Sequence, residues 1–250
     1  MKKSNLYFYV TFKRTNGIKL FILNLFLALC SWPRLFLEVF IRKNFGERYF
    51  LLYTSICAAI WLALLPRLFT NWGASITDII GDNITWYAYL GAFLYFSVKR
   101  HFETVREPGV FDFAKFSLSP GIIHPWFRNL TIFGNNPSTR VIATILEPGV
   151  FLIAGGLLAL LKQEIGYLLM GSSIIYSISW AAQYHLGDQF IMDKIDEGIC
   201  NEEFANTFVD GLPPEETRGF EVYGDKPRNR EFRRKVAESI IDEEPAADVF

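Results

Sequence analysis

The chain has 250 residues, of which 51% are hydrophobic, and a formal net charge of −1. Soluble domains contain about 45–50% apolar residues, so this total alone does not separate a soluble protein from a membrane protein. The chain has three cysteines, Cys30, Cys57 and Cys200, with no CxxC pair among them, so neither a disulfide framework nor a zinc site is indicated.

Charge is distributed unevenly along the chain. Residues 1–184 hold 17 Lys and Arg against 9 Asp and Glu, a net +8, whereas residues 185–250 hold 8 against 17, a net −9. The long apolar runs also end before position 185. A basic, apolar body followed by an acidic tail predicts membrane contact at one end and a soluble partner at the other.

Four apolar runs predict transmembrane helices, because a hydrocarbon core about 30 Å thick needs about 20 apolar residues. The runs at about 49–65 and 141–161 are strongly apolar. Those at about 84–98 and 166–184 carry Trp and Tyr toward their ends, as helices do at the lipid–water boundary. The expected fold is an all-α membrane protein with four transmembrane helices in a domain over 48–184.

Basic residues indicate how these helices are oriented. They gather before the first span and between the second and third, and the positive-inside rule places such segments in the cytoplasm. Four spans then leave both termini cytoplasmic, with an external loop near 66–83 and a tight external hairpin at 162–165. The basic residues concerned are Arg42, Lys43, Arg48, Lys99, Arg100, Arg106, Lys115, Arg128 and Arg140.

The N-terminal segment 1–47 is expected to lie in the membrane interface. Its apolar run 18–41 is interrupted by Pro33, Arg34 and Glu38. Proline breaks a helix and a central charge is costly in a bilayer, so two short amphipathic helices on the cytoplasmic surface fit better than a span. A cleavable lipoprotein signal is the other alternative, but a large residue stands where a small one should precede the cysteine.

The remaining segments are assigned to the cytoplasm. The loop 99–140 is rich in Phe and Trp and contains Pro and Gly, which predicts a loop that follows the membrane surface and contacts phospholipid. The acidic tail 185–250 begins with an amphipathic helix whose apolar residues recur at helical spacing opposite its acids. A second charged helix is expected at about 227–241, followed by a fraying end.

Glu147 followed by Pro148 inside the third span is the most unusual feature of the sequence. Pro148 has no N–H and so removes the α-helical donor of the Thr144 carbonyl. A carboxylate beside an opened turn can bind protons or cations in a membrane. It can also fasten two helices, with Glu147 neutral or paired to Arg140 two turns earlier. The second interpretation is favoured, because no other span contains an acid or histidine that could form a relay.

Small residues indicate where helices approach one another. Ser173, Ser177 and Ala181 recur at i, i+4 and i+8 in the fourth span, beside Gly171. Such a stripe allows close packing with another helix of this chain, with a second copy or with another membrane subunit. Gly155 and Gly156 in the third span are the candidate counterpart.

The acids of the tail are expected to form a solvent-exposed helix face to which a soluble cytoplasmic protein binds. These candidate docking residues are Asp188, Asp193, Asp196 and Glu197. The calcium-binding EF-hand pattern fails, because Ile and Phe occupy two of its ligand positions. The three histidines lie in no catalytic or metal-binding motif, so the sequence predicts neither an enzyme nor a metal or other cofactor.

Four segments together resemble a known group of proteins: YAYLGAFLYFSVKRHFETVRE, FSLSPG, TRVIATILEPGVFLIAGGLLALL and DQFIMDKIDEGI. They are similar to multi-spanning membrane proteins encoded with conjugative type IV secretion systems, over about residues 86–210. In those proteins an aromatic span ends in a His/Arg cluster, and another carries Glu-Pro before a glycine-rich turn. The resemblance implies a component of a DNA-transfer apparatus in a bacterial inner membrane.

The sequence therefore predicts a non-enzymatic membrane subunit of a multi-protein assembly, with no direct binding to nucleic acid. The alternative is a small proton- or cation-coupled transporter that uses Glu147. The substitution Glu147→Gln distinguishes the two, because a fastener tolerates an amide that still forms hydrogen bonds, whereas a proton carrier loses activity.

Overall fold

The computed structural model describes residues 6–13, 17–69, 75–105, 117–131 and 134–240. Within those ranges the ordered elements are helices and no strand is present, although isolated bridge residues occur, as in the antiparallel bridge between Lys43 and Ile122. The all-α prediction is confirmed. The α-helices are α1 (Leu6–Thr11), α2 (Gly17–Ile41), α3 (Leu52–Phe69), α4 (Ile76–Asp82), α5 (Ile84–Thr104), α6 (Pro125–Arg128), α7 (Thr139–Val141), α8 (Glu147–Leu160), α9 (Glu164–Ala205) and α10 (Arg230–Ile240).

Three short helices of other types are also found among the described residues. The π-helix η2 (Ile142–Leu146) joins α7 to α8, and a second π-helix, η3 (Asn206–Asp210), follows α9. The 3₁₀-helix η4 (Pro214–Glu216) lies in the tail. A π-helix closes its hydrogen bonds five residues apart and marks places where a regular α-helix is interrupted.

The chain divides into two compact units. The bundle unit consists of Ile22–Tyr184, and the terminal unit consists of Met1–Phe21 together with His185–Phe250. Helices α2 and α9 contribute to both.

In the part of the chain that the structure describes, three helices are long and apolar enough to cross a membrane, namely α2, the continuous helix over Thr139–Leu160, and the helix over Glu164–Asp210. The helix at Leu52–Leu68 is apolar but shorter, and α5 is not among the three. Three such helices indicate an integral membrane protein. The sequence's count of four spans differs because it includes the runs within α3 and α5 and leaves out α2.

Helix α2 is a single helix of 25 residues with Pro33 inside it, where the sequence predicted two short helices. The prediction of a break at Pro33 was wrong. The half of α2 after Pro33 is held by packing, since Phe36, Leu37 and Val39 are buried in the core of the bundle unit. Membrane proteins tolerate proline in helices where neighbouring groups stabilise the opened turn.

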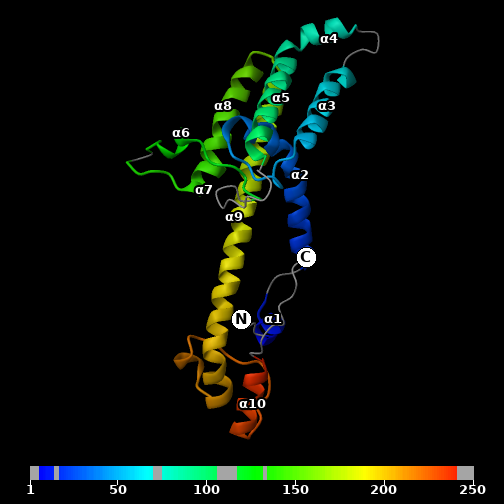
Figure 1. Ribbon diagram of the computed structural model, residues 1–250. Helices are drawn as coiled ribbons and strands as arrows, with labels where there is room; N and C mark the ends of the chain where they lie inside the picture. Colours follow the sequence, from blue (N-terminus) through cyan, green and yellow to red (C-terminus); the bar gives the residue numbers. More distant parts are fainter. Residues whose placement is uncertain (1–5, 14–16, 70–74, 106–116, 132–133, 241–250) are drawn as a thin grey trace. The chain divides into compact units, whose positions relative to one another are not determined.

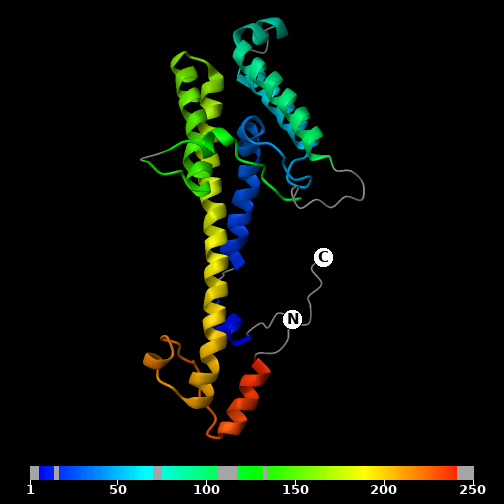
Figure 2. The same ribbon diagram turned by 60° about the vertical axis from the view of Figure 1, so that its left-hand side comes forward.

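Two antiparallel helix pairs form the bundle unit. Helices α3 and α5 lie side by side (Figure 1), with the Trp86 indole and the Tyr87 hydroxyl donating hydrogen bonds to the carbonyl oxygens of Leu62 and Ala63. Helix α8 lies beside the first half of α9 in both views (Figures 1 and 2). The turn between α8 and α9 contains Lys162 in the left-handed region, φ 58°. A tight turn therefore lies close to the predicted hairpin at 162–165, although α9 already begins at Glu164, and its external position stays a prediction.

The connection between α2 and α3 pairs with part of the long loop. The N–H groups of Gly46 and Arg48 donate to the carbonyl oxygens of Ser119 and Ser117. Gly121 lies beside this connection at φ +87°, and a Cβ there would lie 3.0 Å from the Lys43 oxygen, so glycine is required. Residues 106–116 and 132–133 of the expected membrane-following loop lie outside the described residues.

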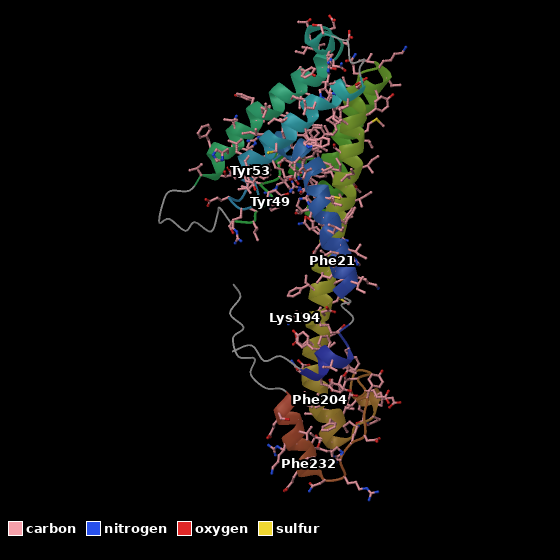
Figure 3. The ribbon with its side chains drawn as sticks, turned by 90° about the vertical axis from the view of Figure 1, so that its right-hand side faces the viewer. Phe21, Tyr49, Tyr53, Lys194, Phe204 and Phe232 are labelled. Carbon is pink, nitrogen blue, oxygen red and sulfur yellow. The ribbon has the colours of Figure 1, made fainter. Side chains whose placement is uncertain are left out.

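The terminal unit has its own aromatic core. Phe8 of α1 and Phe204 of α9 are buried in it with Phe220 (Figure 3 labels Phe204). The Tyr7 hydroxyl accepts a hydrogen bond from the N–H of Tyr223 at 2.6 Å and donates to the carbonyl of the same residue at 3.1 Å. Burial raises the pKa of the Tyr7 phenol above 10.0. The beginning and the end of the chain therefore fold together.

Helix α10 in this unit agrees with the second charged helix that the sequence predicted at about 227–241. Its Ala237 is buried in the aromatic core, while Phe232 is exposed (Figure 3). The end that was expected to fray, residues 241–250, lies outside the described residues.

Candidate functional site

Glu147 begins α8 and is fully buried. Its carboxylate accepts hydrogen bonds from Nε and Nη2 of Arg42, which directly follows α2 and is 1% exposed. The Tyr176 hydroxyl of α9 donates a further hydrogen bond to the carboxylate at 2.6 Å. This one side chain therefore connects α8, α9 and the end of α2.

A second buried ion pair lies one helical turn away in the sequence. Arg34 and Glu38 are i,i+4 neighbours on α2, with Nη2 of Arg34 3.0 Å from Oε1 of Glu38. The Tyr49 hydroxyl donates to Glu38 at 2.8 Å and accepts from Arg34 at 2.7 Å. Figure 3 shows Tyr49 in the connection that follows α2. Arg34 also donates from Nη1 to Ser179 on α9 at 3.1 Å.

Trp180 on α9 contacts both arginines. The guanidinium carbons of Arg34 and Arg42 lie 4.4 Å and 4.3 Å from its ring centroid. An arginine over an indole face gains cation–π and stacking energy that a lysine would not reproduce. We call Arg34, Glu38, Arg42, Glu147 and Trp180 the ion-pair cluster. Its two positive and two negative charges cancel, so no net charge is buried.

The sequence missed most of this cluster. Arg34 and Glu38 were interpreted as interruptions of an apolar run, although their i,i+4 spacing is itself the signature of a helical ion pair. The Arg42–Glu147 pair joins residues 105 positions apart, so no local pattern reveals it. Arg140, the partner that the spacing suggested for Glu147, has its guanidinium carbon 5.5 Å from the Tyr184 ring centroid.

Pro148 is accommodated by the π-helix that precedes it. In η2 the Glu147 N–H donates to the Ile142 carbonyl, five residues earlier, so the regular α-helical pattern is already interrupted where Pro148 follows. The Ser177 hydroxyl of α9 donates to the Thr144 carbonyl at 2.6 Å. That carbonyl is the group whose α-helical donor Pro148 removes. One turn further along, the Ser173 hydroxyl donates to the carbonyl of Pro148.

Glycines bring α8 and α9 together toward the other end of this contact. A Cβ on Gly155 would lie 2.8 Å from the Gly166 oxygen, and a Cβ on Gly166 would lie 2.5 Å from the Ala159 nitrogen. Gly156 and Gly171 have open space where a Cβ would stand, and Ala181 is exposed. We call the line of contacts from Thr144–Ser177 to Gly155–Gly166 the α8–α9 seam.

The seam contains only part of the predicted packing set. Ser173 and Ser177 do lie in a helix contact, but they meet the carbonyls around the proline, and Gly155 meets Gly166. Gly156 is not packed against Ser173 or Ser177, because a helix turns by about 100° per residue and points its neighbour elsewhere.

The four acids proposed for docking divide into two environments. Asp188 and Asp196 are exposed and Asp193 is half-buried. Glu197 is only 6% exposed, and its carboxylate lies 2.6 Å from Nζ of Lys194 on the same helix. Its placement on a solvent-facing surface was wrong, because little of Glu197 is exposed, whereas Lys194, labelled in Figure 3, is exposed.

In the part of the chain that the structure describes, no three His, Cys, Asp or Glu side chains are grouped to hold a metal ion. The fold and the ion-pair cluster define a class: an all-helical protein with membrane-length helices fastened by buried ion pairs. No protein-family model, curated protein or solved structure matches the chain.

Proposed function

We propose that the protein is a non-enzymatic integral membrane subunit of a multi-protein assembly. The observation that carries this proposal is the pairing of Glu147 with Arg42. Arg42, at the end of α2, and Tyr176 of α9 both donate hydrogen bonds to this carboxylate, so one side chain holds three elements together. A buried carboxylate with these partners fits the role of a helix fastener.

The same geometry argues against the transporter alternative. A proton carrier must gain and lose its proton within a working cycle, and it needs a path to water. Glu147 is fully buried and its partner Arg42 is also buried. Protonation of Glu147 would leave the Arg42 charge uncompensated, which is a costly state in a low-dielectric interior.

The two units have different roles in this proposal. The bundle unit anchors the subunit in the membrane, and phospholipid covers its exposed apolar side chains. The terminal unit binds a soluble partner. The four spans expected from the sequence, with basic residues near their ends, support a cytoplasmic position for both termini. The resemblance to proteins encoded with conjugative type IV secretion systems supplies the kind of assembly, a DNA-transfer or secretion apparatus in a bacterial inner membrane.

Extraction in mild detergent tests the proposal. An affinity-tagged chain is purified from the cells that produce it, and its size is measured by native electrophoresis and mass photometry. We expect a complex several times larger than one 28.8 kDa chain, containing other proteins in fixed ratio. Recovery of the chain by itself, or as a homo-oligomer that moves protons or cations in liposomes, would contradict the proposal.

A further inference from the structure

The terminal unit contains a groove of about 560 Å³ along the outer side of α9. Its helical wall is made by side chains from Gln189 to Cys200 that recur every three or four residues, and its floor includes Phe8 and Phe220. Small-molecule and peptide sites typically measure about 300–1,000 Å³, so the size is that of a binding site.

Three carboxylates line this groove: Asp193 and Asp196 from α9, and Glu221 from the segment after η4. Among the residues that the structure describes, none of the three has an ion-pair or hydrogen-bond partner. Arg218 also lines the groove, but its guanidinium is bound by Glu202 at 2.9 Å and Glu203 at 3.2 Å. The groove therefore presents uncompensated negative charge above an aromatic floor.

We infer that this groove binds a basic, apolar segment of a soluble protein, one that carries Lys or Arg beside large aliphatic or aromatic side chains. The inference rests on the proposed function and names the docking site and the chemistry of its partner. Apolar side chains would cover Met192 and Tyr223, which line the groove and are exposed, and the cations would pair with Asp193, Asp196 and Glu221. Charge complementarity of this kind selects partners and speeds their encounter.

The shape favours a peptide segment over a compact molecule. The wall residues on α9 run from Gln189 to Cys200, a rise of about 16 Å at about 1.5 Å per residue, so the groove is elongated along the helix. Recognition of a helical or extended segment uses such spaced contacts. The carboxylates also repel nucleic acid and anionic lipid headgroups, whose phosphates carry the same sign of charge.

Peptide selection on the full-length chain tests the inference. The chain is placed in zwitterionic nanodiscs and panned against a phage library of random dodecapeptides, after subtraction on empty discs. We expect the selected peptides to be enriched in Lys and Arg, with apolar residues three or four positions apart. Their binding should weaken by about tenfold with the triple variant Asp193→Asn, Asp196→Asn, Glu221→Gln.

A matched variant shows whether the groove itself is responsible. Asp225→Asn, Glu215→Gln and Glu216→Gln remove the same charge from exposed positions of the terminal unit outside the groove, and should leave binding unchanged. Acidic peptides, an equal loss with both variants, or no selection above empty discs would each overturn the inference. These results are distinguishable from failure of the proposed function, because the size of the native complex is measured independently.

Discussion

The Ser177 hydroxyl donates a hydrogen bond to the Thr144 carbonyl oxygen at 2.6 Å, across the α8–α9 seam. Serine in this position therefore does more than leave space for a neighbouring helix. It supplies a donor to the carbonyl that Pro148 deprives of its α-helical partner, so a helix irregularity and an interhelical contact stabilise each other.

Removal of the Ser177 hydroxyl should lower the free energy of unfolding more when Pro148 is present than when it is replaced. We expect Ser177→Ala to destabilise the bundle unit by about 1–2 kcal/mol, because a partly buried carbonyl loses a hydrogen bond. In a Pro148→Ala background the new N–H can serve Thr144, and the cost of Ser177→Ala should fall by at least half. Unfolding in mixed detergent micelles measures the four proteins of this double-mutant cycle. Equal costs in both backgrounds would show that Ser177 acts only through its size.

The Arg42–Glu147 pair predicts that a second substitution restores the stability that the first one removes. Arg42→Met should destabilise the protein by about 3–5 kcal/mol, because Glu147 remains as an uncompensated buried charge. Glu147→Gln alone leaves Arg42 unpaired and should also be costly, so this single substitution does not separate a fastener from a proton carrier as cleanly as the sequence suggested. The double variant Arg42→Met, Glu147→Gln removes both charges and should recover most of the lost stability.

The readouts for this pair are the unfolding midpoint and the size of the native complex. A fastener needs no net charge at this position, so the double variant should still assemble. If stability recovers in the double variant but its native complex is lost, the carboxylate has a role beyond fastening.

Glycines of the seam provide matched substitutions. Gly166→Ala would place a Cβ 2.5 Å from backbone atoms of α8, so the helices must separate, and we expect a loss of about 2–3 kcal/mol. Gly156→Ala and Gly171→Ala enter open space and should be neutral, or stabilising by up to about 1 kcal/mol through higher helix propensity. Thermal unfolding of the three variants in one detergent compares them directly. Destabilisation by Gly156→Ala or Gly171→Ala would place a second helix on those faces.

The junction between Tyr7 and Tyr223 predicts how the N-terminal helix is held. Tyr7→Phe keeps the aromatic packing against Phe204 but removes both hydrogen bonds to the backbone of Tyr223. We expect α1 to detach more often, with a several-fold faster proteolytic cleavage near it, since each lost hydrogen bond is worth about 0.5–1.5 kcal/mol. Tyr223→Phe is the control, because its side chain takes no part in these bonds.

The same junction should depend on pH. Burial raises the pKa of Tyr7 above 10.0, which means that the docked state disfavours the tyrosinate. Its stabilising contribution is therefore present at neutral pH and is lost as the pH rises through and above about 10. Hydrogen exchange of α1 should accelerate over that range in the wild type and change less in Tyr7→Phe.

Local sequence patterns were sufficient for the helical class, for the turn at 162–165 and for α10. Each depends on residues within one or two helical turns, such as the run of apolar residues before Leu161 and the charged face around Arg234. The same locality explains why Ser173 and Ser177 could be assigned to a helix contact, since small residues at i and i+4 share one helix face.

The sequence by itself therefore determined a set of helices and the faces on which they can pack. Only the tertiary structure decided which faces meet: Arg42 with Glu147 over 105 positions, Ser177 with Thr144, and α1 with the tail. The physical reason is that a buried charge needs a partner but does not specify where in the chain that partner lies. The fold decides which of the available opposite charges lies beside the buried one. In this protein Arg42, which also contacts Trp180, lies beside Glu147.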